Sequence, residues 1–136
     1  RNCGKKTSEV PASSSTSEYV DAGQTKSLGG RVLYPNGDEA ELVIIEVYRN
    51  DLTIPANEMT YVESDQILKG GRITARDTET SGRFCFKKLP AGNYMLRVNT
   101  IGKNSQFSTM HIFVTLVPKS KEHVSRELEV SLKFAI

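Results

Sequence analysis

Two histidines, two cysteines and a scatter of carboxylates are the residues of this 136-residue chain whose types could support chemistry. His111 lies in a segment of alternating polarity, and His123 lies in a turn rich in Lys and Glu. A catalytic histidine needs a nucleophile or a metal beside it, and the chain has no Gly-x-Ser-x-Gly, His-Glu-x-x-His or Gly-rich phosphate-loop motif. We therefore expect two surface histidines without a catalytic role, in a protein that is not an enzyme.

The carboxylates do not form a set suited to catalysis or metal binding. Glu127 and Glu129 share one face of an expected strand, but alternation places that face in solvent, which does not suit paired-carboxylate glycoside hydrolysis. Glu63 and Asp65, together with Asp51, are the acids that could bind Ca²⁺, although loops that bind hard ions usually space their acids more densely. The sequence predicts no metal site and no cofactor.

Cys3 and Cys85 are far apart in sequence and have no ligand pattern around them that would form a zinc site. Cys3 stands before a polar tether, which resembles the mature start of a bacterial lipoprotein, although Asn2 departs from the small residue usual before the lipid-bearing cysteine. A free thiol is the second interpretation. A disulfide with Cys85 is the third, and it would close a loop of about 80 residues and stabilise the fold by ~4 kcal/mol. The sequence leaves all three open, and Cys3 is the predicted lipid-attachment residue.

The first 26 residues are expected to be a disordered tether. Residues 7–24 are mostly Ser, Thr, Glu, Ala, Gly and Asp, with only Val10, Tyr19 and Val20 as sizeable apolar side chains. Such a segment buries too little apolar surface to offset the entropy lost on ordering. We therefore expect a flexible Ser/Thr-rich segment over residues 1–26 and one folded domain over residues 27–136.

The rest of the chain alternates apolar and polar residues in short segments separated by turn signals, the pattern of half-buried strands. Phe84 and Phe86 are expected to face inward, so Cys85 should point outward. Residues 50–66 break the pattern and predict an irregular insertion with a short edge strand at 59–62, and no window shows helical periodicity. The main strands are expected within residues 28–34, 41–49, 67–77, 82–98 (two strands about a Pro/Gly turn), 107–117 and 127–136.

The most specific motif lies within residues 82–98. It reads Gly-x-Phe-x-Phe from Gly82, and then Leu-Pro-x-Gly-x-Tyr-x-Leu-x-Val from Leu89. This wording resembles the hallmark of the carboxypeptidase regulatory-like family, and Thr78 keeps that family's spacing before Gly82. The resemblance implies an all-β fold, a seven-stranded antiparallel Greek-key β-sandwich of the transthyretin (prealbumin) type. A fold shared by many functions does not identify one of them.

Composition excludes several partners and activities. The net charge is only +2 and no run of five basic residues occurs, so we expect no nucleic-acid binding, and we interpret Lys87-Lys88 and Lys119 to Lys121 as solvated loop ends. No apolar segment reaches the roughly 18–20 residues of a membrane span. Hydroxyisourate hydrolase, a transthyretin relative, uses a Tyr-Arg-Gly-Ser motif in its active site, whereas residues 133–136 here read Lys-Phe-Ala-Ile. We therefore do not expect this enzyme activity.

We expect a monomeric, non-catalytic module that binds a protein or glycan or acts as a spacer at the cell envelope. It would lie outside the cytoplasm and contact the membrane only through a lipid on Cys3. The alternative is a carbohydrate-binding module that uses the 50–66 insertion and three outer-face aromatics, Tyr48, Tyr61 and Phe113, because sugar faces stack on exposed rings. The opposing interpretation is that Tyr48 and Phe113 pack beneath the insertion.

Overall fold

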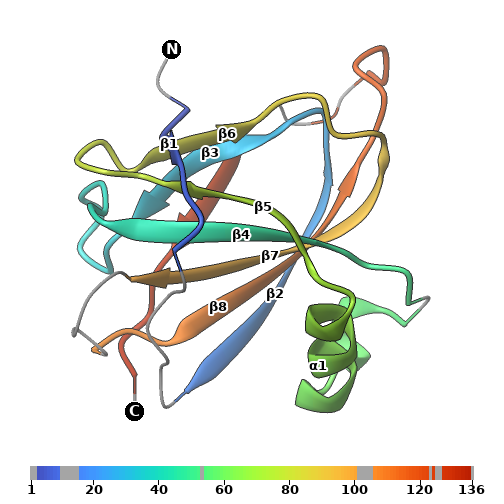
Figure 1. Cartoon of the computed structure of the whole chain (residues 1–136), viewed down its shortest axis with the longest axis horizontal. Coiled ribbons are helices and arrows are strands. Elements are labelled where there is room, and N and C mark those ends of the chain that lie inside the picture. The colour runs from blue at the N-terminus through green and yellow to red at the C-terminus, as the bar shows by residue number, and fades with distance from the viewer. Residues whose placement is uncertain are drawn as a thin grey trace.

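The part of the chain that the structure describes folds into two facing β-sheets, with a short α-helix on the outer face of the larger sheet (Figure 1). The computed structural model describes residues 3–9, 16–52, 54–100, 106–122, 124 and 127–135. The larger sheet has the strand order β1-β5-β4-β7-β8-β2, and the smaller sheet has the order β6-β3-β9. The strands are β1 (Lys5–Lys6), β2 (Ser17–Thr25), β3 (Leu28–Leu33), β4 (Val43–Arg49), β5 (Arg72–Asp77), β6 (Arg83–Phe86), β7 (Gly92–Thr100), β8 (Thr109–Leu116) and β9 (Leu128–Ser131).

The main core lies between the two sheets. It forms because alternate residues of each strand point to the same face of a sheet, so period-two apolar positions meet those of the facing sheet. Ten apolar residues at alternating positions of the expected strands, Phe84 and Phe86 among them, are all found in this core, each no more than 7% exposed. They are Phe84, Phe86, Tyr94, Leu96, Val98, Ile112, Val114, Leu128, Val130 and Leu132. The mostly-β architecture expected of a β-sandwich is therefore confirmed.

The expected strand number and pairing are wrong. The described residues form nine strands, not seven, and two of the pairings are parallel: β2 with β8, and β3 with β9. Both parallel pairings join segments that are distant in the sequence, whereas alternation within one segment carries no information about the direction of its neighbour. The sheets are therefore mixed.

The N-terminal segment is not a disordered tether over the residues that the structure describes. Ser17–Thr25 forms β2 at the edge of the larger sheet, and Lys5–Lys6 pairs with the end of β5. The apolar content of β2 is small, but a neighbouring strand supplies a parallel ladder that satisfies its backbone, and Val20 and Ala22 pack against the main core. The expected domain boundary at residue 26 therefore falls just after a strand of the domain; residues 1–2 and 10–15 of the expected tether lie outside the described residues.

The 50–66 insertion contains helix and not the expected edge strand at 59–62. A 3-10 turn at Ala56–Glu58 leads into α1, which spans Tyr61–Lys69. Thr60 caps the helix: its hydroxyl accepts a bond from the Val62 amide, and the Glu63 carboxylate accepts one from the Thr60 amide. This Ser/Thr-x-x-Glu capping box is a sequence signal for the start of a helix. It was overlooked because the segment has no clear helical period of apolar residues.

The N-terminal segment also joins the two sheets covalently. A disulfide links Cys3 to Cys85 of β6, and the Cys85 amide donates to the Cys3 carbonyl at 3.1 Å. Cys85 is in the outward register expected for it, since its neighbours Phe84 and Phe86 are buried. A thioether-linked lipid would need the same sulfur of Cys3, so this disulfide and a lipid on Cys3 exclude each other within one molecule. None of the described helices is long and apolar enough to span a membrane.

Candidate functional site

Two of the three aromatic residues proposed for sugar stacking are buried. Tyr48 and Phe113 are each 5% exposed and belong to a second apolar cluster between the larger sheet and α1, together with Met59, Ile67 and Met95. Tyr61 is 75% exposed at the start of α1. The rings of Tyr48 and Phe113 therefore offer no face to a ligand. Their burial agrees with the interpretation that they pack beneath the insertion, and it leaves no aromatic platform for a sugar at these two residues.

A charged cluster lies beside this second cluster, on the same face of the larger sheet. Glu46 of β4 is only 2% exposed, and its two carboxylate oxygens accept from Arg97 Nε at 2.7 Å and from Arg72 Nη1 at 3.1 Å. The Tyr48 hydroxyl donates to the same carboxylate at 3.0 Å. Sequence reasoning missed this pairing, because the three charged residues lie on three separate strands.

The electrostatics of this cluster do not favour proton transfer. Burial, together with the nearby charge of Glu46, raises the pKa of Tyr48 to about 12, so its hydroxyl stays protonated. Burial alone would lower the pKa of Arg97, but the hydrogen bond and charge of Glu46 outweigh it and raise that pKa. A carboxylate saturated by two guanidinium groups and a hydroxyl is poorly placed to act as a base. The cluster is best understood as one buried carboxylate held by two partly exposed arginines.

His111 is buried and not on the surface as expected. It is 5% exposed on β8, and its ring stacks on Tyr19 of β2 with ring centroids 4.8 Å apart. Burial lowers its pKa to about 4, so the ring is neutral at physiological pH. Nδ1 has no hydrogen-bond partner among the described residues. The second histidine of the chain, His123, lies outside the described residues.

The acids considered for Ca²⁺ do not form a cation site. Among the described residues, no group of three or more His, Cys, Asp or Glu side chains is arranged to hold a metal. Glu63 is instead bound to Thr60 in the capping box, and these hydrogen bonds lower its pKa. Asp65 forms an exposed ion pair with Lys69 on the same helix at 3.4 Å.

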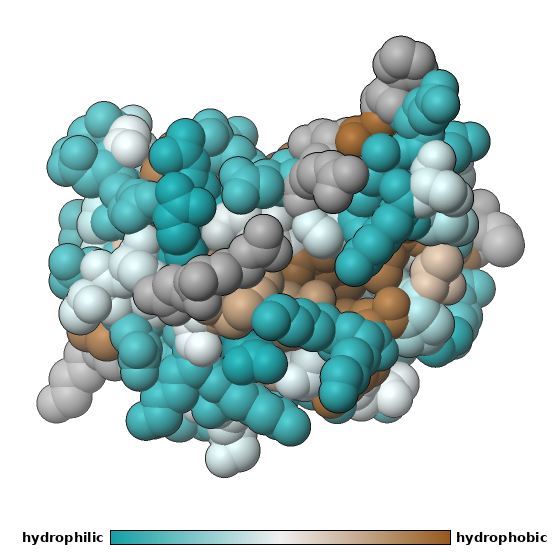
Figure 2. All heavy atoms as spheres, turned by 90° about the horizontal axis from the view of Figure 1, so that it is seen from above, coloured by the Kyte–Doolittle hydropathy of each residue, from teal (hydrophilic) through white to brown (hydrophobic). Residues whose placement is uncertain are grey.

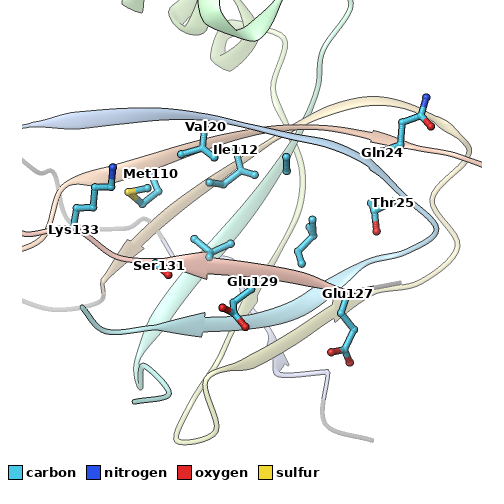
Figure 3. Close-up of a pocket in the computed structure, with 12 residues that line it drawn as sticks. Val20, Gln24, Thr25, Met110, Ile112, Glu127, Glu129, Ser131 and Lys133 are labelled. Atoms are coloured by element: carbon cyan, nitrogen blue, oxygen red, sulfur yellow. The ribbon is translucent and has the colours of Figure 1, made fainter. Parts of the chain in front are cut away.

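An open groove runs between β2 and β9, along the side of the sandwich opposite the disulfide. Figure 3 shows Val20, Met110 and Ile112 of β2 and β8 on the groove side of their strands, whereas Gln24, Glu127 and Glu129 point outward at its rim. The groove has a volume of about 450 Å³. Its apolar lining comprises Val20, Ala22, Met110, Ile112, Leu128 and Val130, and its polar lining comprises Gln24, Thr25, Glu127, Glu129, Ser131 and Lys133.

The fold closes this groove at both ends and leaves it open along its length. At one end the chain itself passes from β2 at Thr25 into β3 of the smaller sheet. At the other end Lys133 Nζ and Glu18 Oε1 approach to 3.5 Å, which joins the two sheets by an ion pair. Glu129 is turned to Arg31 of the neighbouring strand at 2.9 Å, so its charge is directed along the smaller sheet. The groove therefore presents an apolar floor and a polar rim on which Glu129 and Lys133 are held in ion pairs.

The two strands that flank the groove are the outermost strands of their sheets. β2 ends the larger sheet and β9 ends the smaller one, so each has a backbone edge without a strand partner among the described residues. Such edges accept an additional strand readily, and a bulge in β2 between Asp21 and Gly23 is one device that limits uncontrolled pairing. Sequence reasoning missed this site because it assigned β2 to the tether; the alternation of Val20 and Ala22 with Asp21 was the available signal.

Comparison with known proteins found no relative of this chain. No protein-family model, no curated protein and no solved structure matches the chain.

Proposed function

We propose that the chain is a non-catalytic β-sandwich module that works outside the cytoplasm and binds an extended segment of a partner protein in the β2–β9 groove. The open groove between two strand edges is the observation that carries this proposal. An extended peptide can pair its backbone with a strand edge and place alternate side chains on the apolar floor. A compact or strongly charged ligand would use neither feature.

The disulfide supports the location. Cys3–Cys85 accounts for both cysteines of the chain, and disulfides of this structural kind persist mainly in oxidising compartments such as the periplasm or the extracellular space. The lack of a proton-transfer set around Glu46, Tyr48 and His111, within the part of the chain that the structure describes, supports the non-catalytic part of the proposal. The partner is thus proposed to be another protein of the cell envelope, met outside the cytoplasm.

We also retain the family resemblance as a proposal. The Gly-x-Phe-x-Phe strand is β6, and the Leu-Pro-x-Gly-x-Tyr segment leads into β7, so the resembling residues occupy a strand–turn–strand unit. The Tyr94 hydroxyl donates to the Pro90 carbonyl at 2.5 Å, which ties the turn to the strand that follows it. A carboxypeptidase regulatory-like origin with added N-terminal strands is the proposal that these residues support.

The test is selection of peptides against the purified chain, followed by mapping of the bound site. Peptides recovered from a random display library should alternate apolar and polar residues, and should shift amide NMR signals of β2 and β9. Ala22→Arg, which puts a charged side chain on the groove wall, should weaken their binding at least ~10-fold, the usual effect of placing a charge in an apolar contact. Thr80→Arg adds the same charge at an exposed turn outside the groove and should leave binding unchanged.

Two outcomes would contradict the proposal. One is recovery of peptides that bind the Ala22→Arg variant as well as the wild-type chain. The other is a pattern of shifted signals confined to residues outside β2, β8 and β9. Thermal unfolding of both variants checks that a loss of binding does not reflect a loss of folding.

A further inference from the structure

Three loops that carry lysines meet at one end of the sandwich. Lys26 lies in the corner between β2 and β3, Lys87 and Lys88 lie between β6 and β7, and Lys119 lies after β8. These positions are widely separated in sequence. In the structure all four line one hollow beside the start of β3 and the end of β6. Lys87, Lys88 and Lys119, which were expected to be separate solvated loop ends, are thus brought together with Lys26 by the fold.

The hollow is larger than the β2–β9 groove and differs in character. Its volume is about 1050 Å³, and the view from above shows an apolar floor between hydrophilic rims on this side of the molecule (Figure 2). The apolar residues that line it are Leu28, Phe84, Phe86, Leu89 and Leu116. Leu89 is half-buried, so part of its side chain remains available at the surface.

The charge around the hollow is strongly one-sided. Among the described residues that line it, five carry a positive charge, the four lysines and Arg83, and one carries a negative charge, Glu127. Arg83 is paired with Glu39 at 3.5 Å, whereas no ion pair involves the four lysines among the described residues. The whole chain carries only +2, from 18 basic and 16 acidic residues, so this surplus is a local feature. Cations around a concave, low-dielectric wall concentrate anions there.

We infer that this hollow is a second binding site, distinct from the β2–β9 groove, and that it takes an anionic polysaccharide. The lysines, as point charges on flexible stems, suit carboxylate, sulfate or phosphate groups spaced along a polymer. Leu89, the half-buried apolar residue of the lining, offers a contact for the carbon face of a sugar ring. The concave shape does not match a flat membrane surface, and the described residues that line the hollow include no exposed aromatic ring on which nucleic-acid bases would stack.

The test uses heparin oligosaccharides as the anionic polysaccharide probe, with the disulfide-bonded full chain and calorimetric or fluorescence titration. We expect saturable binding that weakens linearly in a plot of log affinity against log salt, because bound cations release counterions from the polymer. Replacing Lys87 and Lys88 together by Gln should reduce affinity about ten-fold at low salt and lower the salt slope by about half, since two of the four lysines are removed.

The matched control is the double variant Lys5→Gln and Lys6→Gln. It removes the same charge from another exposed, adjacent lysine pair that does not line the hollow. It should leave affinity and salt slope close to wild type. An equal loss in the two double variants would overturn the proposal, because it would show attraction to net charge alone.

Competing probes give the remaining outcomes. Neutral dextran should not bind. An oligonucleotide or vesicles containing anionic lipid, at matched charge concentration, should bind more weakly than heparin. Tighter binding of either would overturn the assignment to a polysaccharide. The Ala22→Arg variant of the groove should bind heparin normally, so failure of the groove proposal and failure of this one are distinguishable.

Discussion

Gly82 occupies a position where both backbone conformation and neighbouring atoms restrict the side chain. It has φ of +71° at the entry to β6, and a Cβ there would lie 2.7 Å from the Glu39 Cβ. Gly37 has φ of +94°, but a Cβ added to it would meet no atom within 4 Å. The two glycines therefore separate the cost of a left-handed backbone from the cost of a steric clash.

We predict that Gly82→Ala destabilises the fold more than Gly37→Ala. The Gly37 variant should cost about 1 kcal/mol, the penalty for an L-residue in the left-handed region. The Gly82 variant should cost about 2–3 kcal/mol, because it adds backbone displacement at the contact with Glu39 and Ala40. Urea unfolding at unchanged m-value measures both, and equal midpoints would contradict the steric contribution.

Because His111 is buried in its neutral form, we predict that the folded chain loses stability in acid. Its pKa is about 4 in the folded chain and about 6.5 when unfolded, so between these values the unfolded chain binds more protons. The stabilisation is present above pH 6.5 and is lost as pH falls toward 4. The free energy of unfolding should decrease by up to about 3 kcal/mol over that window from this group alone.

The measurement compares unfolding of the wild-type chain and of His111→Phe at pH 7 and pH 4.5. Phenylalanine keeps an aromatic ring against Tyr19 but does not titrate. The variant should lose less stability on acidification than the wild type, while carboxylates contribute equally to both. If the stability of the wild type and of the variant changed equally with pH, His111 would have the same pKa in the folded and unfolded chains, which would contradict the prediction.

Among the elements, α1 depends on its first turn and on one apolar face. Only Ser64 and Ile67 are buried within it, and the helix has nine residues, so it is too short to be stable in isolation. The second apolar cluster holds it on the larger sheet, and the Thr60 cap satisfies its first amides. The helix therefore forms because local capping and tertiary contacts coincide.

Thr60→Ala should destabilise this helix by about 1 kcal/mol, the usual cost of removing a Thr N-cap. Amide hydrogen exchange should accelerate over Tyr61–Lys69, with little change in β4 or β7. Thr80→Ala removes the same hydroxyl at an exposed turn and serves as the control. Uniform acceleration across the whole chain would contradict a local role for the cap.

The two sides of the sandwich differ when the molecule is considered as a whole. One side is closed by the Cys3–Cys85 disulfide and by the pairing of β1 with β5, whereas the opposite side keeps the β2–β9 groove open. The two cysteines are 82 residues apart in sequence, so the disulfide removes considerable freedom from the unfolded chain. Stability on one side is thus combined with access on the other.

We predict that Cys3→Ser combined with Cys85→Ser lowers the free energy of unfolding by ~4 kcal/mol, from the loss of loop closure in the unfolded chain. Reductant should lower the stability of the wild-type chain by a similar amount and leave the double variant unchanged. A wild-type chain that is fully reduced, as shown by thiol alkylation, and equally stable would contradict this contribution.

Local alternation of residue types was sufficient to predict the strands of the main core and the outward register of Cys85. Phe84 and Phe86, like Leu128 and Val130, are buried because alternation on a strand is a local property that any facing sheet can use. The Thr60–Glu63 capping box was also present in the sequence, although its short helix had too few apolar positions to be recognised by period.

The meeting of distant segments could be seen only in the folded chain. β2 is a strand because the fold places β8 beside it as a parallel partner. The fold also brings Cys3 to Cys85, which forms the disulfide, one of the three possibilities that the sequence left open for Cys3. It buried Tyr48 beneath α1 and gathered lysines from three loops around one hollow. Each of these outcomes depends on contacts between residues far apart in the chain, and a local pattern of residue types carries no information about them.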